Sequence, residues 1–136
     1  MRCARLATFA LLVLLLGTAP LQAESLRLDG DRRAALAALP LLHGAPLAEE
    51  SFAGKAVVVA FFASWCPPCH PEFDNLARAQ RTFGDDLAIV AVNIFEVWGP
   101  FTGTERRTAF LARKDPPFHV VGDGEAVAEG FAGVTR

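Results

Sequence analysis

Two continuous apolar runs, with a stretch of helical periodicity between them, most constrain how this chain can fold. The runs are "AVVVAFFA" at residues 56–63 and "LAIVAVNIF" at residues 87–95, and both are rich in β-branched side chains. Such runs suit buried strands, and we expect the first to be a central strand covered on both faces. Between them, apolar residues recur on one helical face from Pro67 to Phe83, and Gly84 is a natural stop signal. The pattern predicts a strand, a helix and a second strand joined by a right-handed parallel crossover.

Shorter elements are expected on either side of this unit. Thr104 is placed to cap a helix that turns Phe110 and Leu111 inward, and Pro116 would end it. The 136 residues hold no internal repeat, so one modest domain is expected. The further elements predicted are a helix over 31–39, a loop over 43–54 that could hold a short strand, a helix over 104–114, a strand over 118–121 and one helical turn over 125–130.

The stretch "SWCPPCHPEF", residues 64–73, directly follows the first apolar run. It therefore lies at the carboxyl end of the predicted strand, where open α/β sheets place their sites. Cys66 and Cys69 stand three positions apart, with Pro67 and Pro68 between them. A disulfide between these cysteines would close a very short loop, and short loops gain the least stability from cross-linking. The spacing therefore favours a reactive disulfide over a structural one.

The position of the pair also favours an ionised sulfur. Disulfide exchange needs a thiolate, and a free cysteine, with a pKa of about 8.5, is mostly protonated at neutral pH. If the helix begins at Pro67, the sulfur of Cys66 lies beside its amino end, where backbone N–H groups and the macrodipole stabilise negative charge. The pKa of Cys66 is then expected in the range of roughly 3.5 to 7.5. Cys69, one turn on, is placed to resolve a mixed disulfide, and we expect its sulfur to be the more buried.

Residues 1–23 have the three-part layout of a secretory signal, because Arg2 and Arg5 precede an apolar run and a small residue, Ala23, follows it. The run is about half of the roughly 20 residues that a membrane-spanning helix needs, so we favour cleavage over an uncleaved membrane anchor. Export would place the protein in the periplasm or another extracytoplasmic, oxidising space. Cleavage would also remove Cys3 and leave no unpaired cysteine.

The charge of the chain argues against nucleic acid as a partner. The sequence has a net charge of −2 at neutral pH. Loss of Arg2 and Arg5 with the signal would make the mature protein about two charges more negative. Neither form offers the basic excess that polyanion binding needs.

With these features, the sequence resembles the exported thioredoxin-like thiol-disulfide oxidoreductases of the TlpA and ResA type. The most specific part is W-C-P-P-C after a buried strand, and "FAGK" at 52–55, Glu72 and "EAVAEGFAGVTR" at 125–136 support it. The resemblance implies a thioredoxin-like three-layer α/β/α fold with a central mixed sheet over residues 24–136. It also implies Cys66 as the attacking thiol and Cys69 as the resolving thiol, with Trp65, Pro67 and Pro68 shaping the site.

The same resemblance implies what the protein works with. Clients would be proteins with disulfides or thiols, such as apocytochrome c or copper-centre proteins. A membrane thiol-disulfide carrier would supply electrons, and no cofactor is expected. Because paired prolines remove N–H donors near the sulfur, we expect the dithiol to act as a reductant.

Two departures from the family lie close to the dithiol. Relatives usually carry an acidic or amide side chain about six residues before the first cysteine, where this sequence has Ala60. Glu72 is therefore the replacement we consider as proton acceptor for Cys69. His70 and Pro71 follow the pair where relatives often have a basic and a small residue. We interpret His70 as a solvated residue in preference to a pKa-tuning one, and expect Pro71 to remove a first-turn hydrogen bond and bend the helix.

A third departure concerns the end of the sequence. In relatives, a segment like Gly133-Val134-Thr135-Arg136 leads into a cis-proline facing the dithiol, then two antiparallel strands and a last helix. The sequence is therefore expected to be either a fragment or a truncated protein that lacks these last elements, and we favour a fragment.

Other functions also fit parts of this sequence. Cys66, Cys69 and His70 also satisfy the C-x-x-C-H motif for covalent c-type haem, for which only His43 or His119 would remain as a second axial ligand. The sequence offers no second pair of ligands for a zinc site, so no metal is expected. A thioredoxin-fold binding domain with a spectator dithiol is the remaining alternative. His43 and His119 are otherwise interpreted as surface or loop residues, and Trp98 as a loop-packing residue.

Overall fold

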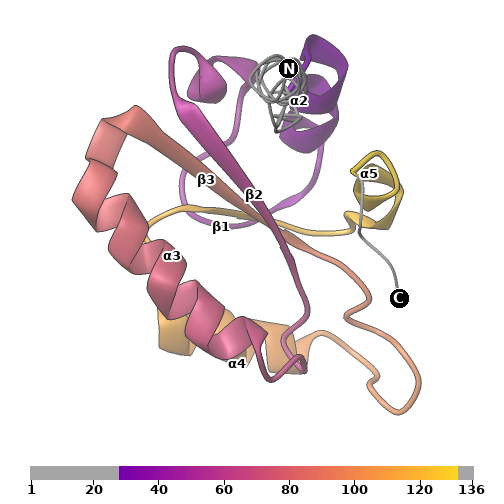
Figure 1. The fold of residues 1–136 in the computed structure, drawn as a ribbon. Helices are drawn as coiled ribbons and strands as arrows, with labels where there is room; N and C mark the ends of the chain where they lie inside the picture. Colours follow the sequence, from indigo (N-terminus) through magenta and orange to yellow (C-terminus); the bar gives the residue numbers. More distant parts are fainter. Residues whose placement is uncertain (1–27, 132–136) are drawn as a thin grey trace, which may run out of the picture.

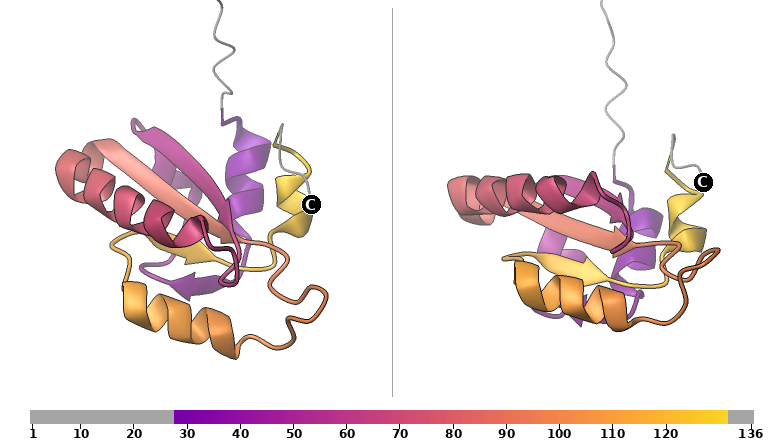
Figure 2. Two further views of the ribbon diagram at one scale, coloured as in Figure 1. Left: turned by 60° about the horizontal axis from the view of Figure 1, so that its bottom comes forward. Right: turned by 90° about the horizontal axis from the view of Figure 1, so that it is seen from below.

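The computed structural model describes residues 28–131. The predicted signal sequence, Cys3 and residues 133–136 lie outside the described residues. A four-stranded sheet stands between two layers of helices (Figures 1 and 2). The elements are α2 (Gly30–Ala37), β1 (Leu41–His43), the 3₁₀ helix η1 (Glu49–Phe52), β2 (Ala56–Phe62), α3 (Cys69–Phe83), the 3₁₀ helix η2 (Gly84–Asp86), β3 (Leu87–Asn93), α4 (Glu105–Lys114), β4 (His119–Val121) and α5 (Glu125–Ala128).

The sheet is mixed, with the strand order β1-β4-β3-β2. β2 runs parallel to β3, β3 runs parallel to β4, and β1 is antiparallel to β4. The predicted parallel unit of β2, α3 and β3 is confirmed, and so is the predicted mixed sheet. Among residues 28–131, no helix is both long enough and apolar enough to cross a membrane.

The central strand β3 divides the hydrophobic core into two clusters. All seven of its residues are buried, and alternate side chains point to opposite faces of the sheet. Leu87, Ile89 and Ala91 join the cluster under α3 and α4. Ala88, Val90 and Val92 join the cluster under α2, η1 and α5. The three-layer α/β/α architecture follows, because each face of β3 is covered by helices.

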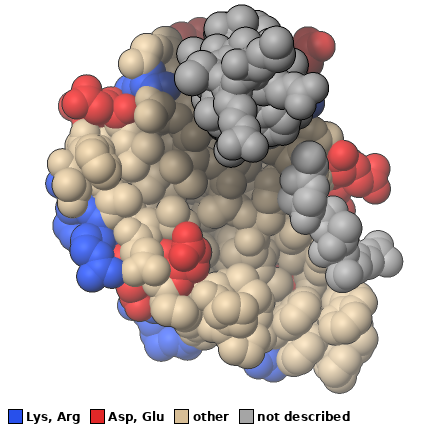
Figure 3. Space-filling model, viewed as in Figure 1, with Lys and Arg blue, Asp and Glu red and all other residues tan. Residues whose placement is uncertain are grey.

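Of the prediction that β2 is a central strand covered on both faces, the central position is wrong for the described part of the chain. β2 lies at the edge of the sheet and pairs only with β3, and the side chain of Val58 is 36% exposed. The apolar run correctly indicated two packed faces, since Val59 and Phe61 pack against one cluster and Phe62 belongs to the other. The run does not indicate whether a second strand pairs with β2. Figure 3 shows a largely uncharged surface over β2.

The ends of α3 and α4 agree with the sequence patterns, with one shift and one missing capping bond. α3 begins at Cys69 and not at Pro67, because the preceding residues form a turn in which the Cys69 N–H donates to the Cys66 carbonyl. Gly84 ends the helix with a φ of 52°, in the region that favours glycine. Thr104 is the N-cap of α4 as predicted, but its side chain makes no capping hydrogen bond.

The short strand expected near residues 43–54 also lies earlier than predicted. It occupies Leu41–His43, and the 3₁₀ helix Glu49–Phe52 follows it. The remaining expected elements, α2, β4 and α5, lie within their predicted ranges or within one residue of them.

Phe110 should be a main anchor of α4 on the sheet. It is fully buried and its ring contacts those of Phe62 and Phe73, with centroids 5.8 and 4.8 Å away. We expect Phe110→Ala to lower the free energy of unfolding by about 3–5 kcal/mol, measured by denaturant titration. The matched control is Phe83→Ala, because Phe83 is 59% exposed although its helical position suggested the apolar face. Equal losses in the two variants would contradict this description of the core.

Candidate active site

Cys66 and Cys69 are joined as a disulfide across the turn that leads from β2 into α3. Their Cα atoms are 5.4 Å apart, a usual separation for bridged cysteines. Both residues are half-buried, and Cys69 packs against the core cluster beneath α3. The dithiol thus lies at the carboxyl end of the strand and the amino end of the helix, as the sequence pattern predicts.

The amino end of α3 offers few free N–H donors to the sulfur atoms. With Pro68 as N-cap, the positions without an intrahelical acceptor are Pro68, Cys69, His70 and Pro71. The two prolines have no N–H. The Cys69 N–H donates to the Cys66 carbonyl at 3.1 Å, and the His70 N–H donates to the Pro67 carbonyl at 3.3 Å. In this disulfide form, the main stabilising contribution left to a negative charge at this end of the helix is the macrodipole.

The same geometry corrects the expectation for Pro71. Because α3 begins two residues later than predicted, Pro71 occupies the third helical position, where a backbone N–H has no intrahelical acceptor. The predicted loss of a first-turn hydrogen bond therefore does not occur, and α3 continues to Phe83.

Trp65, next to the first cysteine, is packed by the loop between β3 and α4. Its ring stacks against Trp98 and Phe101, with centroids 5.3 and 5.0 Å away, and its Nε1 donates to the Phe95 carbonyl at 2.8 Å. Trp98 and Phe101 also pair with each other through an isolated antiparallel bridge. Trp98 does pack within its loop as expected, while half of its side chain stays exposed. The loop therefore holds Trp65 in place beside the dithiol.

His70 is not the solvated residue that we expected. It is half-buried, its Nε2 donates to the Ser64 carbonyl at 3.1 Å, and its ring lies edge-on to Phe110 at 4.9 Å between centroids. The reason is that the first turn of α3 faces α4, which brings Phe110 against it. The ring nitrogen that would bind haem iron is used here to tie the helix to the turn before it.

The other two histidines do not join this site. His43 lies on β1, at the opposite edge of the sheet from β2, and its Nε2 bonds to the Pro116 carbonyl at 3.0 Å. His119 lies on β4, and its Nδ1 bonds to the Ala45 carbonyl at 2.8 Å. Both rings link strands to neighbouring loops. Among residues 28–131, no three His, Cys, Asp or Glu side chains gather as a possible set of metal ligands.

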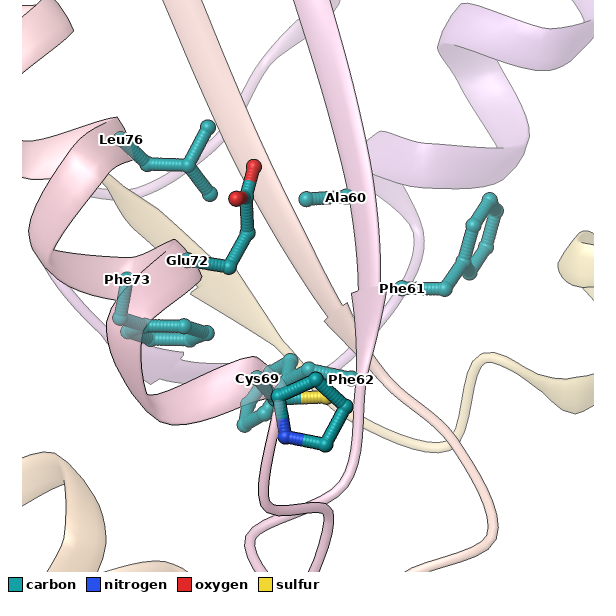
Figure 4. Close-up of a pocket in the computed structure, with 8 residues that line it drawn as sticks. Ala60, Phe61, Phe62, Cys69, Glu72, Phe73 and Leu76 are labelled. Carbon is teal, nitrogen blue, oxygen red and sulfur yellow. The ribbon is translucent and has the colours of Figure 1, made fainter.

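A pocket of about 290 Å³ lies beside Cys69, between β2 and α3 (Figure 4). The exposed side chain of Glu72 extends from α3 toward Ala60 and Leu76. Its carboxylate therefore enters the space in front of Ala60. The residues that line the pocket are Ala60, Phe61, Phe62, Pro68, Cys69, Glu72, Phe73 and Leu76.

A buried carboxylate behind the dithiol was missed by the sequence analysis. Glu96 is 6% exposed and accepts hydrogen bonds from the Ser64 N–H at 3.0 Å, from the Ser64 hydroxyl, and from Asn93 Nδ2 at 2.9 Å. Arg107 extends this network by donating to Asn93 Oδ1 at 2.9 Å. The network fixes Ser64, two residues before the first cysteine, to the end of β3. The only signal was a charged residue directly after the apolar run at residues 87–95, and its partner Ser64 lies 32 residues away.

Loss of the Glu96 carboxylate should destabilise the protein, because it would leave the buried Ser64 N–H without its acceptor and Asn93 Nδ2 with only its bond to the Phe62 carbonyl. We expect Glu96→Ala to lower the free energy of unfolding by about 2–4 kcal/mol, and Glu96→Gln by less, because the amide keeps one acceptor oxygen. Denaturant titration measures both. Glu72→Ala, which removes an exposed glutamate from the same region, is the control and should leave stability unchanged. If Glu96→Ala is as stable as this control, the network does not hold the active-site turn.

Comparison with known proteins places the chain in a family. The sequence model described as Redoxin matches residues 29–132. The chain is 31% identical over 93 residues to the thioredoxin-like protein YneN of Bacillus subtilis, covering 65% of this chain and 51% of that protein. It therefore spans about half the length of this curated relative.

Solved structures share the fold. One is a secreted disulfide oxidoreductase of Mycobacterium tuberculosis homologous to Escherichia coli DsbE, with a TM-score of 0.53, 22% identity, and coverage of 71% of this chain and 67% of that one. Another is DsbF of M. tuberculosis, with a TM-score of 0.53, 24% identity, and coverage of 75% and 73%. The expected thioredoxin-like fold is thus confirmed, and the chain belongs to the Redoxin family.

Proposed function

We propose that this protein is an exported thiol-disulfide oxidoreductase that reduces disulfides of client proteins through Cys66 and Cys69. The observation that carries the proposal is the Cys66–Cys69 bridge at the junction of β2 and α3, in a Redoxin-family fold. The short loop between these cysteines contributes little to stability, so the bridge is better explained by its chemistry.

The proposed cycle begins with the reduced protein. The thiolate of Cys66 attacks one sulfur of a client disulfide, which forms a mixed disulfide and releases the other client sulfur as a thiolate. Cys69, deprotonated, then attacks the sulfur of Cys66 and releases the second client thiolate. Two electrons pass to the client, its two thiolates take up protons, and Cys66 and Cys69 are left as a disulfide. The electrons for the next cycle would come from a membrane thiol-disulfide carrier.

The reductive direction is supported by the amino end of α3. A thiolate that is strongly stabilised by N–H donors makes the reduced form stable and the protein oxidising. Here prolines at positions 67, 68 and 71 remove three such donors, and the N–H groups of Cys69 and His70 bond to carbonyls of the turn. The reduced form is therefore stabilised less than in a turn with free amides, which favours donation of electrons.

Glu72 is the proposed proton acceptor for Cys69. Both residues line the pocket between β2 and α3, and the space in front of Ala60 admits the Glu72 carboxylate. Cys69 must lose its proton before it can attack, so a carboxylate in the same pocket would speed the resolving step.

Export and clients complete the proposal. The apolar amino-terminal segment supports passage to an oxidising compartment, and a secreted disulfide oxidoreductase is among the structures that share the fold. In such a compartment, a reductant would act on thiol proteins that must stay reduced, such as apocytochrome c or copper-centre proteins.

Single cysteine variants test the cycle. We expect Cys66→Ser to abolish reduction of a disulfide peptide, because no attacking thiolate remains. Cys69→Ser should instead accumulate a mixed disulfide with the peptide, seen as a covalent adduct by mass spectrometry. Absence of any adduct, together with a Cys66–Cys69 bridge that no dithiol can reduce, would favour the alternative of a thioredoxin-fold binding domain whose dithiol does not react. An intense visible absorption band on the purified protein would favour covalent haem.

If Glu72 is the proton acceptor for Cys69, its removal should slow only the step in which Cys69 resolves the mixed disulfide. We expect Glu72→Gln to slow release of the peptide from the mixed disulfide by about tenfold near neutral pH, because Cys69 loses its proton acceptor. Formation of the mixed disulfide at Cys66 should keep its wild-type rate. Stopped-flow measurement of the two steps separates them, with Glu129→Gln on the opposite face as the control. A loss in the first step alone would assign Glu72 to Cys66 or to client binding.

A further inference from the structure

A second groove, of about 510 Å³, lies on the other side of the active-site turn from the Glu72 pocket, between that turn and α4. Trp65 and Pro67, on either side of Cys66, form one wall. Arg106 and Arg113 form the other wall, and Ala109 between them leaves room because its side chain is short. The residues that line the groove are Ser64, Trp65, Pro67, His70, Arg106, Ala109 and Arg113.

The basic wall follows from helical geometry. Arg106, Ala109 and Arg113 are spaced by three and four positions, so they share one face of α4. Seven residues of helix span about 10 Å, and an extended peptide covers that length with about three residues. The wall is therefore long enough to follow a short stretch of a client chain.

These two arginines have no acidic partner in the described part of the chain. The ion pairs found among residues 28–131 use Arg32, His43 and Lys114. Arg106 lies over the ring of Phe101 at 5.0 Å, and no carboxylate lines the groove. Glu96, which bonds to Ser64 on this side of the turn, is buried and also bonded to Asn93. The groove is thus locally cationic on a protein whose net charge is −2.

We propose that this groove binds an acidic stretch of the client polypeptide, next to the client cysteine that reacts with Cys66. This inference rests on the proposed function and adds a substrate class to it. Trp65 and Pro67, the two chain neighbours of Cys66, line the groove. When a client is held in a mixed disulfide with Cys66, the residues that flank the client cysteine therefore lie beside the groove. Guanidinium groups pair well with carboxylates, and a cationic wall also speeds encounter with acidic segments.

The test uses three disulfide peptides of equal length that differ only at two positions within three residues of the cysteine. These positions carry Glu, Gln or Lys. Each rate of reduction by the protein is divided by the rate with a small free dithiol, because nearby charges alter the intrinsic reactivity of the peptide disulfide. At low ionic strength, we expect the Glu peptide to be reduced about three- to tenfold faster than the Gln peptide, and the Lys peptide more slowly. The preference should shrink as salt is added.

Variants locate the preference. The double variant Arg106→Gln with Arg113→Gln should reduce Glu and Gln peptides at similar normalised rates. Reversal of both charges, Arg106→Glu with Arg113→Glu, should make the Lys peptide the better substrate. The control is Arg78→Gln with Arg81→Gln, which removes the same charge from the exposed side of α3 and should keep the wild-type preference. Circular dichroism checks that each variant is folded.

The outcomes separate this proposal from the function on which it rests. Two results would contradict the proposal that the groove binds acidic segments: equal normalised rates for all three peptides, or an acidic preference that survives loss of both arginines. Neither result would contradict the proposed oxidoreductase activity. Failure to reduce even the Gln peptide counts against the oxidoreductase itself.

Discussion

The parallel pairing of β2 with β3 is the constraint on which the rest of the structure depends. Their register runs from Ala56 beside Leu87 to Phe62 beside Asn93, so both strands end at the same edge of the sheet. Burial of β3 on both faces fixes that register, because a shift by one residue would move its side chains to the opposite face. The turn that carries the dithiol therefore follows one strand, and the carboxylate that holds it follows the other.

The active-site turn is held on three sides by different interactions. The Glu96 carboxylate bonds to Ser64, and Trp65 is stacked by aromatic side chains of the loop before α4. His70, on the first turn of α3, bonds back to the Ser64 carbonyl. These contacts join the backbone and side chains around Cys66 and Cys69 to β3, to the loop before α4 and to the first turn of α3. The pocket at Glu72 and the groove along α4 lie on two sides of this turn, since Pro68 and Cys69 line the first and Trp65 and Pro67 line the second.

Much of the fold and of the candidate site could be predicted from the amino-acid sequence, and the predictions that were wrong have physical reasons. The elements around the dithiol were predictable because periodicity and proline or glycine signals are local, and the cysteine pair because its spacing is local too. The edge position of β2 was not predictable, because an apolar run indicates that the faces of a strand are buried and does not indicate how many strands pair with it. The burial of His70 and the role of Glu96 depend on contacts with Phe110 and Ser64, and the sequence does not show which distant residues meet.

The sequence by itself determined the parallel strand, helix and strand unit, the dithiol at its junction, and the proline-rich helix start with few N–H donors. These follow from side-chain chemistry and spacing within about thirty residues, where chain geometry leaves few alternatives. Only the tertiary structure decided which groups surround the dithiol: a buried carboxylate from the end of β3, an aromatic loop, and a cationic face of α4. Their positions depend on how separate elements pack together, because burial and charge at a site are properties of the assembled core and not of any one segment.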